Sequence, residues 1–177
     1  MVTTENTPIA QLGAEILRRQ ARPIDDFSSE EFHSLIALML KAMKAADGVG
    51  IAAPQLSASW QVLVVASRPT RRYPTAPEMP PTLMVNPRFD IVDASLHKDW
   101  EGCLSVPGIR ALVPRYRAVA VHFQDRQGEH CQLQLTDFPA RVFQHEFDHL
   151  QGLVYLDRVE NNRDIISETE YFKRIAA

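Results

Sequence analysis

The most informative segment of this chain is His145-Glu146-Phe147-Asp148-His149. In a helix, residues four apart lie on one face, about 6 Å apart along the axis, so both imidazoles can reach one cation. Glu146 follows the first histidine and lies close enough to take a proton from a water activated by that cation. The pattern therefore predicts a helix that carries a hydrolytic metal site. The alternative is an amphipathic helix with two ordinary histidines.

Signals for the start and the stop of a helix stand on both sides of this motif, and they favour the metal site. Thr136 or Asp137 can cap the start, and Pro139 suits the first turn. Gly152 suits the stop just after Leu150.

Outside the motif, the chain predicts few helices. Phe27–Asp47 has one apolar stripe at helical spacing, with Ser28 and Glu31 as a capping box. Weaker helical patterns cover Ala10–Arg19 and Asn162–Ile175. All three are interpreted as core or solvated helices rather than as binding elements.

Short β segments make up the rest of the pattern. The predicted strands are Trp60–Ala66, Leu83–Val85, Phe89–Val92, Ala118–Phe123 and Cys131–Leu135. Asn86–Pro87 should interrupt the second and third of these, and residues 124–130 should link the last two as a hairpin. Ser67–Thr82 holds five prolines and should be an extended loop. Since no βαβ alternation is visible, we expect an α+β fold, mainly antiparallel, packed around the motif helix.

Composition excludes several classes of protein. The 177 residues predict a single domain, 1–177, and the 45% hydrophobic fraction supports a core. A net charge of −3 with scattered basic residues predicts neither nucleic-acid nor membrane binding. The first residues lack the pattern of a signal peptide, so we expect a cytoplasmic protein in which Cys103 and Cys131 do not form a disulfide.

A hydrolytic metal site needs a third protein ligand and an open position for water. No histidine follows the motif, and Glu160, Glu168 and Glu170 lie in a polar stretch that we expect to face solvent. Upstream, Cys103 stands between a glycine and an apolar residue, and its thiolate can bind a metal. A set of one cysteine and two histidines is therefore the best available group of ligands.

A third constellation is Gly48-Val-Gly-Ile-Ala-Ala-Pro-Gln55. Two glycines at the end of a helix give a ligand access to the backbone, and Gln55 offers an amide that can donate to a developing oxyanion. Taken alone, the segment is equally well explained as a helix C-cap followed by a tight turn.

Together the three motifs resemble those of peptide deformylases, which carry GxGxAAxQ, EGCLS and HExDH in this order. The chain has GVGIAAPQ at 48–55, EGCLS at 101–105 and HEFDH at 145–149. Similarity continues in the flanks, at residues 110–115 and at Gln144, and it extends from about the first helix to Asp157.

The resemblance implies an α+β fold and removal of the formyl group from the N-terminal formylmethionine of new polypeptides. It implies a metal held by Cys103, His145 and His149, with Glu146 as the base. Gln55 and the backbone N–H of Leu104 would stabilise the oxyanion. The expected ion is Fe²⁺, although Zn²⁺, Ni²⁺ or Co²⁺ can occupy such a site.

The resemblance also implies where the substrate binds. Val49, Phe138 and Val142 should line a pocket for the methionine side chain. The backbone of Val49, Gly50 and Gly102 should pair with the peptide. Nascent polypeptides are the expected partners, and contact of Asn162–Ile175 with the ribosome is left open, because the mixed charges of that segment favour a solvated helix.

Two other functions remain open from the residues. Another metallohydrolase, such as an endopeptidase, would usually place its third ligand downstream of the motif. A non-catalytic metal-binding module would need a fourth protein ligand to close the tetrahedron. Its candidates are His97, His122 and His130.

Overall fold

The computed structural model describes residues 8–176, and an antiparallel sheet forms its framework. Neighbouring strands follow the order β1-β2-β3-β4-β5, and β6 pairs with β4. The described strands are β1 (Gly50–Ala52), β2 (Val62–Ser67), β3 (Met79–Cys103), β4 (Val106–Gln124), β5 (His130–Thr136) and β6 (Ile165–Ser167). The α+β class is confirmed, although the strands belong to one continuous sheet rather than to several.

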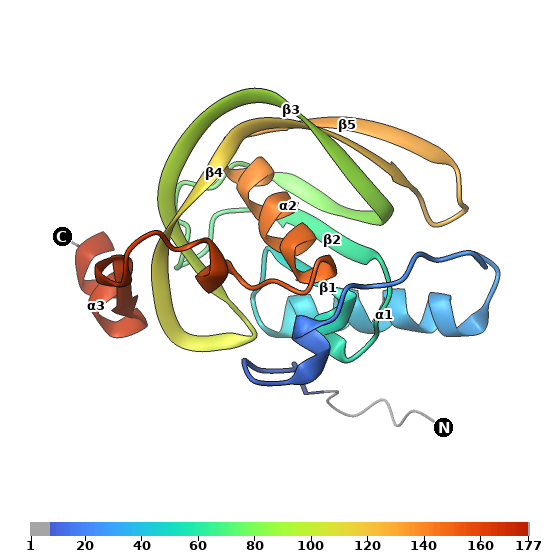
Figure 1. The fold of residues 1–177 in the computed structure, drawn as a ribbon, viewed down its shortest axis with the longest axis horizontal. Helices are drawn as coiled ribbons and strands as arrows, with labels where there is room; N and C mark the ends of the chain where they lie inside the picture. The colour runs from blue at the N-terminus through green and yellow to red at the C-terminus, as the bar shows by residue number, and fades with distance from the viewer. Residues whose placement is uncertain (1–7, 177) are drawn as a thin grey trace.

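Helix α2 (Asp137–Leu150) carries the histidine motif and lies inside the curve of this sheet. Figure 1 shows α2 with β3, β4 and β5 arching over one side and with β1 and β2 on the other. Gln144 attaches the helix to β4, because its Oε1 accepts from the Tyr116 N–H (3.0 Å) and its Nε2 donates to the Tyr116 carbonyl (2.9 Å). The predicted bounds of this helix are confirmed.

A core between α2 and the sheet fixes the position of the motif. Ala140, Phe143 and Leu150 on α2 are fully buried against side chains of β2 and β4, and Val142 is almost fully buried beside them. Burial of apolar side chains contributes about 25 cal/mol per Å² of apolar surface, so the buried face of α2 is strongly held. The other face turns His145 and Glu146 toward the cavity described below.

Helix α1 (Glu30–Ala45) covers the opposite side of β1 and β2 and closes a second core. Its start differs from the prediction by one residue. Ser29 is the cap, since its hydroxyl accepts from the Phe32 N–H (3.3 Å), whereas the Ser28 hydroxyl donates to Asp26 (2.6 Å). The predicted cap at Ser28 is therefore wrong, because Asp26 takes up that hydroxyl.

Strand β3 runs through Asn86–Pro87, where the sequence predicts a break. The strand continues because the register shifts between Val85 and Arg88. Asn86 adopts φ 49° and pairs its side-chain amide with the backbone N–H and carbonyl of Ile24, both at 2.8 Å. Asparagine tolerates this left-handed conformation, so the strand continues through a β-bulge at this point instead of ending.

Three other predicted elements are also different in the structure. The proline-rich loop is shorter, because β3 already begins at Met79 and places Pro80 and Pro81 at a register shift against β2. The predicted helix at 10–19 is only a 3-10 turn, Glu15–Arg18. The predicted helix at 162–175 consists of a 3-10 turn (Asn162–Asp164), strand β6 and the short helix α3 (Glu168–Ile175).

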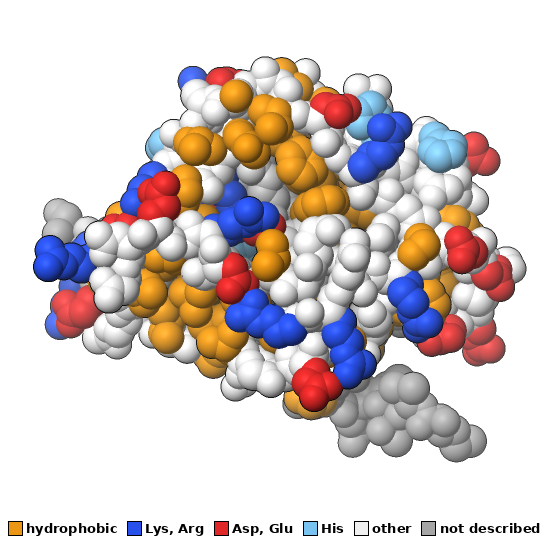
Figure 2. Space-filling model, viewed as in Figure 1, with side chains coloured by type: hydrophobic (Ala, Val, Ile, Leu, Met, Phe, Trp, Pro, Cys, Tyr) orange, Lys and Arg blue, Asp and Glu red, His pale blue; other side chains and the backbone are white. Residues whose placement is uncertain are grey.

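The surface carries charges of both signs. On the face shown in Figure 2, acidic and basic side chains are interspersed, and apolar side chains gather near the top, where β3 arches. Ile91, Val92 and Leu96 are the exposed large apolar residues of that strand. Within residues 8–176, no helix has the length and apolar character that crossing a membrane requires.

Candidate active site

Cys103, His145 and His149 meet beside α2 and form a potential metal site. Their ligand atoms all lie within 4.8 Å of one another, and the Cys103 Sγ is 3.3 Å from the His149 Nε2. Cys103 ends β3 just before the tight turn to β4, which brings its thiol against the motif helix. Burial opposes ionisation of this thiol, yet the two imidazoles lower the pKa of Cys103 well below its usual value. A thiolate with two imidazoles is a donor set that fits a divalent transition-metal ion.

Glu101 orients the first histidine of the motif. Its Oε2 accepts from the Nδ1 of His145 at 2.9 Å, which leaves the Nε2 of that ring as the ligand atom. The ring of Tyr155 stacks on His145 at a centroid distance of 5.8 Å, and its hydroxyl donates to the Ile109 carbonyl. From the sequence, Glu101 is recognised only as part of the EGCLS motif, and Tyr155 has no assigned role.

Buried arginines neutralise the carboxylates behind the site. Arg115 donates to both oxygens of Glu101 (2.9 and 3.0 Å) and to Asp148 (2.6 Å), and Arg141 donates to Glu101 (2.9 Å). Burial raises the pKa of Glu101, but Arg115 and His145 outweigh it and hold that pKa well below the usual range. Arg158 completes the network on Asp148 at 2.7 Å. Because each carboxylate has an arginine as its partner, these groups can stay ionised inside the protein.

Glu146 lies beside the three candidate ligands with one oxygen, Oε2, that has no hydrogen-bond partner among the described residues. Burial raises its pKa to about 7, while the charge of His145 and His149 opposes the rise. A carboxyl group of this kind can accept a proton and give it back near neutral pH. A cation at the site would favour its ionised form.

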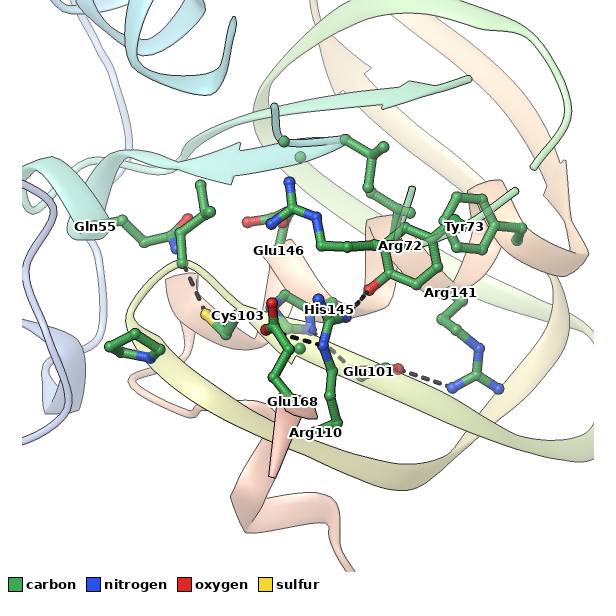
Figure 3. Close-up of a pocket in the computed structure, with 18 of the residues that line it drawn as sticks. Gln55, Arg72, Tyr73, Glu101, Cys103, Arg110, Arg141, His145, Glu146 and Glu168 are labelled. Atoms are coloured by element: carbon green, nitrogen blue, oxygen red, sulfur yellow. Dashed lines mark hydrogen bonds and ion pairs between the residues drawn. The ribbon is translucent and has the colours of Figure 1, made fainter. Parts of the chain in front are cut away.

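Gln55 and the turn after Cys103 form another part of the cavity wall. The side-chain carbonyl of Gln55 accepts from the Ala52 N–H (2.9 Å), which directs its amide nitrogen toward Ser105 Oγ (3.2 Å) and Cys103 Sγ (3.6 Å). Figure 3 shows Gln55 and Glu146 on one side of the cavity and Cys103 below them. Leu104 also lines the cavity. This wall therefore places a fixed amide donor next to the candidate metal site.

The cavity has a volume of about 260 Å³. Its lining includes all the residues that are expected from the sequence to bind the substrate. Phe138 and Val142 come from α2, and Val49 and Gly50 come from the segment after α1. Gly102 comes from the end of β3. The cavity is therefore formed by segments that are far apart in the chain.

At two positions of the cavity wall, neighbouring atoms lie so close that a residue with a Cβ atom would collide with them. A Cβ atom at Gly50 would lie 2.5 Å from the Oε1 of Glu146, and one at Gly102 would lie 2.6 Å from the guanidinium of Arg110. Both distances are shorter than a van der Waals contact allows. The glycines thus let Glu146 and this arginine lie directly against the backbone that lines the cavity.

Another set of lining residues was not expected from the sequence. Arg72 and Tyr73 belong to the proline-rich loop, Arg110 to β4, and Glu168 to α3. Arg110 stands in the flank at 110–115 that resembles the family but had no assigned role, no motif marks Arg72, Tyr73 or Glu168, and Glu168 was expected to face solvent. The sequence gives little indication that these residues line a site, because their segments are far apart in the chain and meet only in the folded protein.

The fourth ligand of a closed metal site is missing from the described part of the chain. The residues grouped as potential metal ligands are Cys103, His145 and His149, and His97, His122 and His130 do not join them. His122 instead lies 3.0 Å from the carboxylate of Asp90, on the sheet. Within residues 8–176, three side chains thus form the set that could hold an ion, and a catalytic zinc-type site commonly uses three protein ligands.

Helix α2 carries a histidine pair and a carboxyl group, and a cysteine lies next to both histidines. The arrangement is typical of a class of metal-dependent hydrolases. Comparison with known families identifies the family within this class to which the chain belongs. The family model described as polypeptide deformylase matches residues 6–164. The chain therefore belongs to the polypeptide deformylase family.

Individual relatives agree with this assignment. Peptide deformylase 2 of Nostoc sp. is 48% identical over 167 residues, which cover 94% of this chain and 93% of the relative. A class I type b peptide deformylase of Acinetobacter baumannii, solved with Met-Ala-Ser bound, has a TM-score of 0.85 at 40% identity and covers 89% of this chain and 100% of its own. A peptide deformylase of Synechococcus elongatus, solved with actinonin, has a TM-score of 0.79 at 33% identity, over 93% of this chain and 84% of its own.

The family establishes the activity of the chain. Peptide deformylases remove the formyl group from the N-terminus of nascent formylmethionine polypeptides, and the family depends on a metal. The chain is therefore an enzyme, and the alternative of a non-catalytic metal-binding module is set aside.

Proposed function

We propose that Cys103, His145 and His149 hold the metal for deformylation and that Glu146 is the catalytic base. The observation that carries this proposal is the convergence of the three ligand atoms within 4.8 Å, beside a buried carboxyl group with an unpartnered oxygen. A divalent cation held there would lower the pKa of a water molecule and polarise the formyl oxygen.

Glu146 moves the proton in this reaction. Its carboxylate takes a proton from the attacking water as the water oxygen bonds to the formyl carbon. When the C–N bond breaks, Glu146 returns this proton to the leaving amine, so that formate and a free N-terminus result. Burial raises the pKa of Glu146, which favours holding the proton, and a cation beside it would favour giving the proton up.

Gln55 and Leu104 stabilise the negative charge that develops on the formyl oxygen. The amide nitrogen of Gln55 already points toward the site, because Ala52 fixes the other end of the amide group. The backbone N–H of Leu104 is the second proposed donor. Such preorganised donors are commonly worth about 10²–10³-fold in rate.

The substrate binds along the glycines and places its methionine side chain against Val49, Phe138 and Val142. Gly50 and Gly102, with Val49, offer backbone groups that pair with the peptide. Support comes from the position of all five residues in one cavity with Glu146 and His145.

The resident ion, the location and the partners are the remaining parts of the proposal. We expect Fe²⁺, with Zn²⁺, Ni²⁺ or Co²⁺ as substitutes that the same donors accept. The chain acts on new polypeptides, so we place it in the cytoplasm, where they are made. Nascent polypeptides are the partner that we propose, and the organisation of residues 1–177 as a single domain stays a prediction.

Formate release from a formyl-Met-Ala-Ser peptide tests the proposal directly. Chelated protein, with metal content checked by elemental analysis, should lose activity, and anaerobic addition of Fe²⁺ or Ni²⁺ should restore it. Full turnover by metal-free protein would overturn the role of the site. A matched variant, Cys103→Ser, should weaken metal binding, because an alcohol is a poorer ligand than a thiolate.

A further inference from the structure

Helix α3 contacts the cavity although the chemistry proposed above requires nothing from it. Glu168, its first residue, lines the cavity, and its Oε2 lies 3.3 Å from the Nε of Arg110. Tyr171, one turn later, is buried, and its hydroxyl donates to the carbonyl of Arg72 at 2.7 Å. The helix thus holds two different parts of the cavity wall.

Arg110 is the first of these parts. Its side chain is buried between Glu168, the hydroxyl of Tyr73 (3.0 Å from Nη1) and the ring of Tyr171, whose centroid lies 5.0 Å from the guanidinium carbon. The guanidinium lies so close to Gly102 that a Cβ atom there would collide with it. Its Nε pairs with Glu168 and its Nη1 with Tyr73. Because a guanidinium has five N–H donors, this group can also donate to a carbonyl of a bound peptide.

The second part is the loop of residues 68–78. Near its middle, Arg72 donates to the carbonyl of Ala46 at 2.9 Å, which fixes the loop to the end of α1. The preceding residue, Arg71, contacts α3, since its guanidinium lies 4.6 Å from the centre of the Phe172 ring. The following residue, Tyr73, lies against Phe138 with the ring centroids 4.8 Å apart. The loop therefore spans from α1 to α3 over the proposed methionine pocket.

Figure 3 shows how these residues lie around the cavity. Arg72 and Tyr73 enter from one side, and Arg110 lies between Glu168 and His145 on the other. Cys103, His145 and Glu146 line the same cavity, and the hydroxyl of Tyr73 lies 3.0 Å from Arg110 at its wall. A peptide that places its first residue in the pocket would therefore pass Arg110 and the loop.

We propose that α3, through Glu168 and Tyr171, positions Arg110 and loop 68–78 as the wall that binds the substrate residues after the formylmethionine. Glu168 and Tyr171 are positioning residues, because they act through Arg110 and through the loop. Without the carboxylate of Glu168, the guanidinium loses its charged partner and can rotate away from Gly102. The inference rests on the placement of the methionine side chain proposed above.

Substrate length separates this role from a merely structural one. Kinetic constants are measured on a formyl-Met amide and on a formyl-Met-Ala-Ser amide, with Glu168→Gln and Tyr171→Phe. Glu170→Gln is the matched control, since Glu170 lies on the same helix but pairs with Lys173 on the surface. Metal content and the midpoint of thermal unfolding are recorded for each variant.

Glu168→Gln should lower kcat/KM for the longer peptide by roughly three- to tenfold, mainly through KM, as expected for loss of a partly exposed charged partner. The loss for the short substrate should be clearly smaller. Tyr171→Phe should change the same ratio in the same direction, and Glu170→Gln should not change it.

Equal losses on the two substrates, or a loss confined to kcat, would overturn the inference, and so would a Glu168→Gln enzyme that matches the Glu170→Gln control. A fall in metal content or in the unfolding midpoint large enough to explain the loss would also overturn it. If the metal-loaded parent released no formate from either substrate, the proposed function itself would fail.

Discussion

Gly50 shows at the level of one residue how closely the base and the substrate channel are packed. A Cβ atom at this position would lie 2.5 Å from Glu146 Oε1 and 2.9 Å from Glu146 Cδ. Because Glu146 is buried on a fixed helix, the collision cannot be relieved by a flexible side chain that simply moves into solvent. The glycine is thus needed for space rather than for its backbone freedom.

Gly50→Ala should therefore lower kcat/KM at least tenfold, since a displacement of about 1 Å near the chemistry can cost 10²-fold. Metal content should stay near that of the parent, because no ligand is touched. Gly48→Ala is the comparison, since its Cβ atom would meet its nearest neighbours only at 3.4 Å and should cost much less. Equal losses for the two variants would contradict this account of Gly50.

Glu101 connects two strands and one helix, so a substitution of it affects how these elements pack together. It lies on β3, accepts from Arg115 on β4, and accepts from His145 and Arg141 on α2. It therefore holds the helix in register with the two strands and orients one metal ligand at the same time.

Glu101→Gln should weaken metal binding by about 10–100-fold, which is the usual effect of losing the partner of a ligating histidine. Its free energy of unfolding should fall by about 3–5 kcal/mol, because Arg115 and Arg141 stay buried without their full counter-charge. Competition with a chelator and denaturant unfolding measure the two effects.

Glu160→Gln provides the control for Glu101→Gln. Glu160 pairs with Lys98 at 3.1 Å on the surface, and such exposed pairs contribute about 0–1 kcal/mol. If the two variants lost similar stability, or if Glu101→Gln bound metal like the parent, the buried network would not have the role described here.

At this scale the sequence predicts the two longest helices and parts of the strands, but it misses residues 93–103 of β3 and residues 106–117 of β4. The motif helix is confirmed at both ends because its apolar face, first-turn proline and final glycine all agree. The β3 bulge at Asn86 and the division of residues 162–175 were missed, because partners distant in sequence decide them: Ile24 binds Asn86, and β4 pairs with β6. Local patterns do not contain such partners.

The cavity is a property of the whole molecule. The motifs at 48–55, 101–105 and 145–149 predict the residues around the proposed metal site, and the structure brings all of them together. The outer wall could not be predicted, since Arg72, Tyr73 and Glu168 lie outside any motif and reach the cavity only through packing of the loop and α3 against Arg110.

The apolar end of the cavity predicts the preference for the first residue. Formyl-Met and formyl-norleucine peptides should react at similar rates, because both bury a linear apolar chain against Val49, Phe138 and Val142. Formyl-Gly peptides should be slower by about two to three orders of magnitude, since each missing methylene costs roughly 1 kcal/mol or more.

Formyl-Asp peptides should also react slowly. Arg141 lines the cavity, but its guanidinium is engaged by Glu101 (2.9 Å) and the Val113 carbonyl (2.7 Å), so it offers little to a new carboxylate. Values of kcat/KM for the four peptides under one metal loading provide the test. Equal values for formyl-Met and formyl-Asp would show that the pocket lies elsewhere.

Formate release by Glu146→Gln, measured at full metal occupancy beside the parent, tests the central claim most directly. Glutamine has nearly the same shape but cannot accept the proton, so the variant should bind one metal ion per chain and lose about 10²–10⁴-fold in kcat. A metal-loaded Glu146→Gln enzyme that releases formate within a few-fold of the parent would contradict the claim that Glu146 is the base.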